Sequence, residues 1–199
     1  DDVFISDSYG ASDNLDGGTG NDILIVDYST YGTSGGAVGG TGISNFIAGK
    51  IHNAIVSGWT TVTYSNVEQF SIVGSPFDDK LKARAGDILN GGSGIDTLSL
   101  DLLGATTPVS VDLTQTNNQV SFGGTQIQNF ELVDRIETGA SDDSIRLSTT
   151  ASRTGGTVDG GAGKDILIVD YSTYGTSGGA VGGTGISNFI AGKIHNAIV

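Results

Sequence analysis

The sequence has no cysteine and no methionine, and its 199 residues include only 2 prolines, 1 tryptophan and 3 glutamates. Without cysteine, no disulfide can contribute to stability. No apolar run reaches the roughly 18 residues of a membrane-spanning helix, so we expect no membrane insertion. Apolar residues make up only 37% of the chain. Such a chain needs a very regular fold or a bound ion to offset the entropy lost on folding.

Basic residues are also scarce, because 9 lysines and arginines stand against 22 acidic residues and leave a formal net charge of −13. This charge disfavours nucleic acids and anionic membranes as partners, since both repel an acidic surface. Nearly all of the acid is aspartate, at 19 residues, and glycine contributes 33 more. Both residue types favour turns. Turns rich in aspartate and glycine supply the oxygen ligands that a hard cation such as Ca²⁺ requires.

The most informative feature is an internal repeat. Residues 22–56 recur letter for letter as residues 165–199, at an offset of 143 residues. Such identity indicates a recent tandem duplication, so we interpret the chain as a window on a longer array. Periodic self-similarity is typical of a solenoid, in which each unit packs only on its neighbours.

The 143-residue unit divides into two related halves. A Gly-Gly motif begins at Gly17, Gly91 and Gly160, in steps of 74 and 69 residues. The segments SNVEQFSIVGSPFDDKL (65–81) and QNFELVDRIETGASDDSI (128–145) keep the same register. We therefore expect the end of a preceding half-repeat at 1–14, half-repeat A at 15–88, half-repeat B at 89–157, and the start of the next unit at 158–199.

Short runs of β-forming residues alternate with clusters of Gly, Asn, Asp and Ser, and no segment has clear helical spacing. The sequence therefore predicts an all-β chain, folded as a parallel β-roll or β-solenoid of tandem repeats. Longer β-rich inserts are expected at 29–64 and 104–127. The predicted strands are 23–28, 61–64, 70–73, 98–103, 109–113 and 129–133.

Three segments, 17–25, 91–99 and 160–168, match the pattern G-G-x-G-x-D-x-U-x, in which U is a large apolar residue. Glycine permits positive φ, so the turn can curl and aim its carbonyl oxygens at one point. The aspartate adds a carboxylate, and the residues after it form a short strand that points U into the core. The candidate metal ligands are Gly18, Gly20 and Asp22 in the first turn, Gly92, Gly94 and Asp96 in the second, and Gly161, Gly163 and Asp165 in the third.

Two such turns stacked on one side of a coil would give Ca²⁺ its six oxygen ligands. If one coil takes two nonapeptides, each aspartate needs a partner about 18 residues away. The sequence offers such partners, and we expect one good site in each cluster. The predicted pairs are Asp22 with Asp2, Asp96 with Asp79, and Asp165 with Asp143.

The turns on the opposite side of the coil carry Asp13 and Asp87, and we expect poorer metal sites there. In the third cluster the corresponding position is Gly156. The apolar U positions should line up inside the roll. Their predicted alignments are Phe4/Leu15/Leu24, Leu81/Leu89/Leu98 and Ile145/Val158/Leu167.

Nothing in the sequence indicates catalysis. His52 and His195 are one repeated position without an acid or base partner nearby, and no G-x-S-x-G motif occurs. The pairs Asp78–Asp79 and Asp142–Asp143 are of the kind that glycosidases use, but their place in the repeat favours metal binding or turn formation. We expect no catalytic residues, no enzyme activity, and Ca²⁺ as the cofactor.

The runs GSPFDDKL, AGDILNGGSGIDTLSLDL and GGTGNDILIV, the last followed by DYS, resemble the hemolysin-type (RTX) calcium-binding repeats of secreted bacterial proteins. The resemblance covers the turn clusters, whereas the two inserts are less typical. Members of that family leave the cell unfolded by type I secretion and fold in external calcium. The resemblance thus implies an extracellular or cell-surface location.

Three functions are compatible with these features. The first is an extracellular structural array, such as a filament, surface layer or adhesin stalk, which folds on binding Ca²⁺ and self-associates through neighbouring repeats. The second is the C-terminal secretion and folding module of a type I-secreted enzyme. The third is a carbohydrate- or surface-binding repeat, in which Trp59 and the tyrosines would form a stacking shelf. The near-identical 143-residue units favour the first.

Overall fold

The computed structural model describes residues 1–7, 13–31, 42–46, 48–53, 60–148, 156–169, 185–187 and 195–197. The described residues form strands and turns without a helix, so none of them belongs to an apolar helix of membrane-spanning length. They divide into two compact units, Asp1–Val169 and Asp170–Val199. The predicted half-repeat boundaries inside these units remain a prediction.

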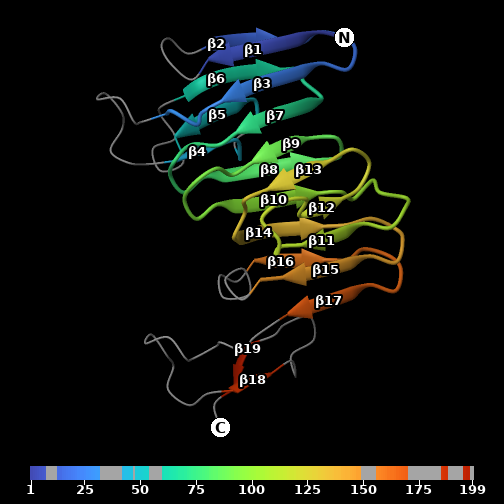
Figure 1. Ribbon diagram of the computed structural model, residues 1–199. Helices are drawn as coiled ribbons and strands as arrows, with labels where there is room; N and C mark the ends of the chain where they lie inside the picture. The colour runs from blue at the N-terminus through green and yellow to red at the C-terminus, as the bar shows by residue number, and fades with distance from the viewer. Residues whose placement is uncertain are drawn as a thin grey trace. The chain divides into compact units, whose positions relative to one another are not determined.

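The first unit is a β-roll in which successive strands alternate between two facing layers (Figure 1). Each coil returns to the same layer one turn later, so most neighbouring strands are parallel. The predicted all-β class and β-roll are thereby confirmed. The first layer holds β1 (Val3–Asp7), β3 (Ile23–Asp27), β7 (Gln69–Val73), β9 (Ile88–Asn90) and β13 (Gln126–Gln128), followed by β12 (Val120–Ser121), β11 (Ser110–Asp112), β15 (Ser144–Leu147) and β17 (Ile166–Val169).

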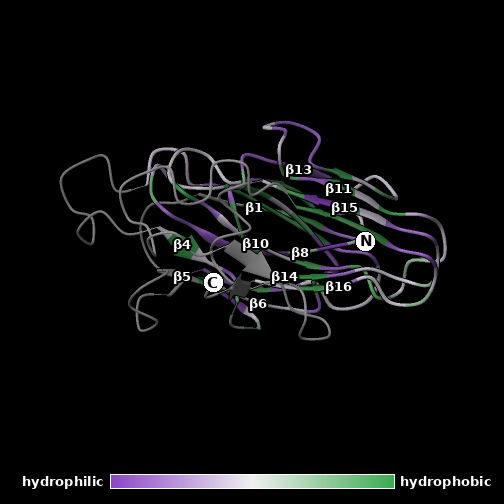
Figure 2. Cartoon of the chain, turned by 90° about the horizontal axis from the view of Figure 1, so that it is seen from below, coloured by the Kyte–Doolittle hydropathy of each residue, from purple (hydrophilic) through white to green (hydrophobic). Residues whose placement is uncertain are grey.

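The second layer is a single eight-stranded sheet. Seen along the stack, β11, β13 and β15 lie on one side of the roll and β8, β14 and β16 on the other (Figure 2). The eight-stranded sheet of the second layer runs in the order β16 (Thr157–Asp159), β14 (Leu132–Glu137), β10 (Thr97–Asp101), β8 (Lys80–Arg84), β4 (Ile43–Ser44), β5 (Lys50–Asn53), β6 (Thr60–Ser65) and β2 (Asp13–Asp16).

The core lies between the layers and follows from the alternation of side chains along each strand. In β3, Leu24 and Val26 are buried, whereas the alternating residues Ile23 and Ile25 are only half-buried. Leu98 of β10 is fully buried in the same way. Burial of each such leucine stabilises the roll by about 1.5–3 kcal/mol.

Strand register brings the predicted apolar positions together, and the predicted alignment is confirmed for three pairs. The pairs are Phe4 with Leu24, Leu81 with Leu98, and Ile145 with Leu167. Leu167 is nevertheless 45% exposed, because β17 is the last strand of its sheet. An inward-facing position is buried only when a further coil covers it.

Both inserts depart from parallel pairing. In the first, β4 and β5 form an antiparallel hairpin that joins β8 to β6, and in the second, β11 pairs antiparallel with β12. Five predicted strands are found as β3, β6, β7, β10 and β11. The predicted strand at 129–133 is correct only for its last two residues, because residues 129–131 form a turn and β14 begins at Leu132. Asn129 has a φ of 58° there, which no strand residue adopts.

The second unit contains β18 (Gly185–Ser187) and β19 (His195–Ala197), which pair antiparallel. Their register places Ile186 opposite Asn196, as Ile43 lies opposite Asn53 one repeat earlier. The duplicated sequence therefore forms the same hairpin twice. The rest of the comparison between 22–56 and 165–199 falls largely outside the described residues.

Candidate metal-binding turns

The three GGxGxD turns share one backbone conformation. Each opens with a polar side chain whose Oδ1 accepts the amide of the second glycine, as Asp16 does for Gly18 at 3.2 Å. Asn90 and Asp159 do the same for Gly92 and Gly161. The second and fourth positions lie in the left-handed region, as the sequence predicts. Their φ values are 76° and 133° at Gly18 and Gly20, 96° and 128° at Gly92 and Gly94, and 75° and 137° at Gly161 and Gly163.

Each GGxGxD turn stacks on an Asp-Asp dipeptide of the preceding coil. The amide of Asp79 donates to Oδ1 of Asp96 at 2.8 Å, and Oδ1 of Asp78 accepts the amide of Ile95 at 2.8 Å. The other two clusters repeat both bonds, so the predicted partners stack on each other in all three clusters. These bonds join Asp2 to Asp22 at 2.6 Å and Asp1 to Asn21 at 2.7 Å, and Asp143 to Asp165 at 3.0 Å and Asp142 to Lys164 at 2.8 Å. Metal binding by these pairs stays a prediction.

Backbone carbonyls of the partner turn face the glycines. A Cβ added at Gly92 would lie 2.8 Å from the Ser75 oxygen, and one at Gly94 would lie 2.8 Å from the Phe77 oxygen. In the third cluster a Cβ at Gly163 would lie 2.4 Å from the Ser141 oxygen. Glycine is needed here because only hydrogen leaves room for these oxygens, and the junction between turns is therefore lined by oxygen.

Each stacked pair contains at least one buried carboxylate, and among the described residues no lysine or arginine pairs with these groups, although the amino group of Asp1 lies 3.9 Å from Oδ1 of Asp22. Asp22, Asp79, Asp96 and Asp143 are each at most 2% exposed. Within the described part of the chain, Oδ2 of Asp22 and Oδ2 of Asp143 are buried and accept no hydrogen bond. Burial raises the pKa of Asp79 to about 7, and burial together with the nearby charges of Asp79 and Glu131 raises that of Asp96 to about 8. A cation at these junctions would remove this cost.

The donors fit calcium in kind, because carboxylate and carbonyl oxygens are its preferred ligands. In the described residues, however, no three carboxylates converge closely enough to hold an ion as they stand. Their oxygens accept backbone amides instead, as Oδ1 of Asp96 does. Oδ2 of Asp22 and Oδ2 of Asp143 accept no hydrogen bond from the described residues and are open to an ion.

The two half-repeats present these turns on opposite edges of the roll. The turn at 17–22 leads from β2 in the second layer to β3 in the first, whereas the turn at 91–96 leads from β9 in the first layer to β10 in the second. Candidate metal-binding junctions therefore occur along both edges.

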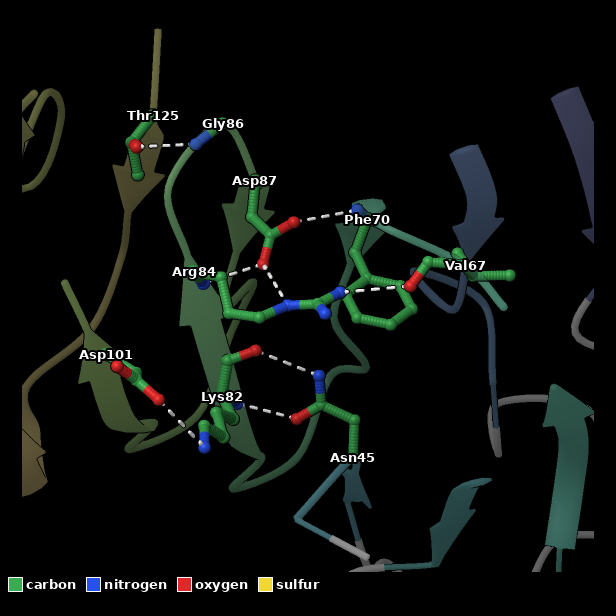
Figure 3. A network of polar contacts seen from close by, with 9 residues as sticks. All are labelled: Asn45, Val67, Phe70, Lys82, Arg84, Gly86, Asp87, Asp101 and Thr125. Carbon is green, nitrogen blue, oxygen red and sulfur yellow. Dashed lines mark hydrogen bonds and ion pairs between the residues drawn. The ribbon is translucent and has the colours of Figure 1, made fainter. Parts of the chain in front are cut away.

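Asp87 lies on the edge opposite the 91–96 turn and has a cation of its own (Figure 3). Its two oxygens accept the amides of Phe70 and Arg84 at 2.8 and 2.7 Å. The Arg84 Nε lies 3.9 Å from Oδ2, and the guanidinium lies 4.9 Å from the centre of the Phe70 ring. Burial raises the pKa of Asp87 to about 6, although these amides and the guanidinium oppose the rise. A protein side chain thus supplies the positive charge at this turn.

Asp13, the other aspartate predicted for the opposite edge, lies at the start of β2. It accepts a hydrogen bond from Oγ of Ser6 in β1. The turn that precedes it, 8–12, falls outside the described residues. Asp13 and Asp87 therefore contact groups quite unlike the stacked carboxylates of the GGxGxD junctions.

Two glutamates also contact the GGxGxD turns, and they were not predicted from the sequence. Oε2 of Glu68 accepts the amide of Asp22 at 3.0 Å, and Oε2 of Glu131 accepts the amide of Asp96 at 2.9 Å. Their signal was available, because Asn-x-Glu occupies the same place in the two aligned segments 65–81 and 128–145. The first aspartates of the dipeptides, Asp1, Asp78 and Asp142, were likewise not predicted as part of the junctions.

A β-roll with Gly/Asp turns stacked in pairs defines a class of calcium-binding repeat protein. Comparison with protein families finds four copies of the RTX calcium-binding nonapeptide repeat, in residues 8–26 and 71–98. These segments contain the turn of Asp22 and the stacked turns of Asp79 and Asp96. The chain therefore carries RTX repeats, and Ca²⁺ is their ligand. Comparison with curated proteins gives no match.

Proposed function

We propose that this chain is part of an extracellular structural array whose folding is coupled to calcium binding. One observation carries the proposal: the same junction of stacked aspartates occurs three times, and each junction contains at least one buried carboxylate. Among the described residues, no lysine or arginine pairs with these carboxylates, and the amino group of Asp1 lies 3.9 Å from Oδ1 of Asp22. In the metal-free chain, burial of these charges opposes folding. Calcium would offset their charge, so folding and binding occur together.

The ends of the first unit support an array rather than a closed domain. Val3 and Ile5 of β1 are 61% and 79% exposed, and Ile166 and Leu167 of β17 are 58% and 45% exposed. Solenoid repeats bury such faces only against neighbouring coils, and an open edge strand invites pairing with another chain. The exact sequence duplication, which repeats the β4–β5 hairpin as β18–β19, fits a run of like units.

An extracellular location fits the chemistry of the turns. Extracellular calcium modules bind with dissociation constants of about 10⁻⁴–10⁻³ M, so they remain empty inside the cell and fill outside it. The chain would stay unfolded during export by type I secretion and fold on contact with external calcium. In this proposal the repeats have no catalytic role.

A secretion and folding module of a larger enzyme is the second candidate, because RTX repeats of the same kind would serve it. The sugar-binding alternative has weaker support. The Tyr28 ring is buried and lies edge-on to Tyr31 at 5.7 Å, and the Tyr64 ring lies 5.1 Å from Phe70. These rings pack on the core, and Trp59 lies outside the described residues.

The test is a calcium titration of the metal-free 199-residue chain, followed by far-ultraviolet circular dichroism and sedimentation velocity. We expect a disordered spectrum that becomes β with Ca²⁺ but not with an equal concentration of Mg²⁺, and that reverts with a chelator. Each filled site should add about 1.4 kcal/mol of stability per decade of free calcium. Larger species should form as the chain folds. An unchanged spectrum would rule out coupled folding, and a folded chain that stays monomeric would favour the secretion module.

A further inference from the structure

Each described half-repeat contains a second kind of turn, Asn66–Glu68 or Asn129–Glu131. It has only three residues, and its asparagine lies in the left-handed region, with φ of 50° at Asn66 and 58° at Asn129. The middle residue points into the core, because Val67 is 6% and Phe130 is 1% exposed. The GGxGxD turns are different, since they place glycines and polar residues at the edge. The middle side chain of the Asn-x-Glu turn therefore packs into the core, whereas the GGxGxD turn lies at the edge of the roll.

Both Asn-x-Glu turns dock under a GGxGxD turn through the same set of hydrogen bonds. The glutamate accepts the aspartate amide, and the carbonyl of that aspartate accepts the amides of the glutamate and of the residue after it. The asparagine Nδ2 donates at 2.8 Å to the side chain that opens the GGxGxD turn. The partners are Asp22 with Glu68 and Gln69, Asp96 with Glu131 and Leu132, Asn66 with Asp16, and Asn129 with Asn90.

The Asn-x-Glu side of each GGxGxD turn offers fewer oxygens than the Asp-Asp side. A Cβ added at Gly91 would lie 2.1 Å from the carbonyl oxygen of Asn129, and the single carboxylate on this side, that of Glu131, already accepts the amide of Asp96. On the other side, the Asp-Asp dipeptide brings two carboxylates, and the carbonyls of Ser75 and Phe77 face the glycines. Calcium takes six to eight oxygen ligands. Only the Asp-Asp side approaches that number.

We propose that each Asn-x-Glu turn joins two successive coils without calcium, and we call this turn the lock. Its glutamate holds the neighbouring GGxGxD turn, so the stack of calcium-binding turns, here called the column, ends at this point. Each GGxGxD turn then binds calcium only on the side of its Asp-Asp partner. This inference rests on the calcium-coupled function proposed above, because a column of calcium-binding turns can end at the lock only if calcium joins the turns on the Asp-Asp side.

Glutamate suits this role because of its length. The three-residue turn holds its backbone close to the core through Val67 or Phe130, and the carboxylate must reach the amide of Asp22 or Asp96. Aspartate is shorter by one carbon–carbon bond, about 1.5 Å, and would not reach. Charge matters less, since a neutral amide oxygen can accept the same hydrogen bond. A metal ligand would show the reverse preference, because calcium favours a carboxylate over an amide.

The test compares Glu131→Gln, Glu131→Asp and Glu131→Ala in the full 199-residue chain at saturating calcium. Bound calcium is counted by equilibrium dialysis, and stability is measured as the urea midpoint. Asp134→Asn is the surface control, because Asp134 is an exposed carboxylate within β14. Asp96→Asn is the positive control for loss of an ion.

We expect all three Glu131 variants to bind as many ions as the parent chain. Glu131→Asp and Glu131→Ala should lower the urea midpoint by similar amounts, and Glu131→Gln by clearly less. Loss of an ion in Glu131→Gln with retention in Glu131→Asp would overturn the lock and make Glu131 a ligand. Unchanged midpoints in all three variants would overturn it as well. If Asp96→Asn keeps every ion, the calcium junction itself is misassigned, and that failure is separate from the lock.

Discussion

The backbone amide of Asp79 donates a hydrogen bond of 2.8 Å to Oδ1 of Asp96, although the two residues belong to successive coils and lie 17 positions apart. Both side chains are buried, and burial raises the pKa of each; the charge of Asp78 adds to the rise at Asp79, and the charge of Asp79 adds to the rise at Asp96. The two aspartates thus meet at one junction between successive turns. Removal of either charge should therefore affect a single shared ion.

The first prediction is that Asp79→Asn and Asp96→Asn each lose the same calcium ion. We expect calorimetry to show one ion fewer than in the parent chain for either variant, and the double variant to lose no second ion. Asp112→Asn is the matched control, because Asp112 accepts bonds from Thr114 and lies 3.7 Å from Arg146, away from the stacked turns. Equal stoichiometry in all variants would show that the pairing does not hold an ion.

The second prediction concerns the glycines of the turns. Gly94→Ala places a Cβ at a φ of 128° and 2.7 Å from the Phe77 carbonyl carbon, so both strain and collision oppose the native turn. Strain of this kind costs roughly 1–3 kcal/mol. Gly104→Ala is the control, since nothing lies within 4 Å of its added Cβ. We expect a lower urea midpoint at saturating calcium for Gly94→Ala alone, and equal midpoints would contradict the turn geometry.

The third prediction is that Asp87 contributes to stability without binding calcium. Asp87→Asn leaves Arg84 without its carboxylate and turns an amide donor toward a backbone amide, which should cost about 1–3 kcal/mol. The number of bound ions should stay the same, because the guanidinium already supplies the positive charge. Equilibrium dialysis and urea unfolding measure both quantities, and a lost ion would return Asp87 to the set of ligands.

Much of the fold could be predicted from the sequence because its signals are local. Period-two runs such as 70–73 and glycine turns such as 17–22 specify strands and tight turns without reference to the rest of the chain. The pairs Asp79/Asp96 and Asp143/Asp165 could be found because a coil has a nearly fixed length. The insert hairpin of β4 and β5 could not, since its antiparallel pairing depends on how β8 and β6 are spaced in the finished roll.

The Asn-x-Glu turns show why part of the site was missed. Asn129, Phe130 and Glu131 contain no glycine, and their residue types continue a β-like run into Leu132. Their conformation is decided by contact with Asp96, 35 residues away. Asp87 was predicted as part of a poorer metal site because its sequence context resembles the other turns, and that assignment stays a prediction. The difference is made by Arg84, whose side chain folds back over Phe70.

The last prediction is that acid partly replaces calcium in the metal-free chain. The pKa values of Asp87, Asp79 and Asp96 in the fold are about 6, 7 and 8, against about 3.9 for an ordinary aspartate. The folded chain therefore keeps protons that the unfolded chain has released. Their stabilising effect is complete below about pH 4 and is lost as the pH rises toward 8, at about 1.4 kcal/mol per pH unit for each such proton. Circular dichroism of the metal-free chain should show β structure increasing as the pH falls from 8 to 5, and Asp96→Asn should flatten this dependence. Calcium affinity should change in the opposite sense, because the ion binds only the ionised carboxylates. A metal-free chain that gains structure as the pH rises would show that these aspartates are not buried as the roll requires.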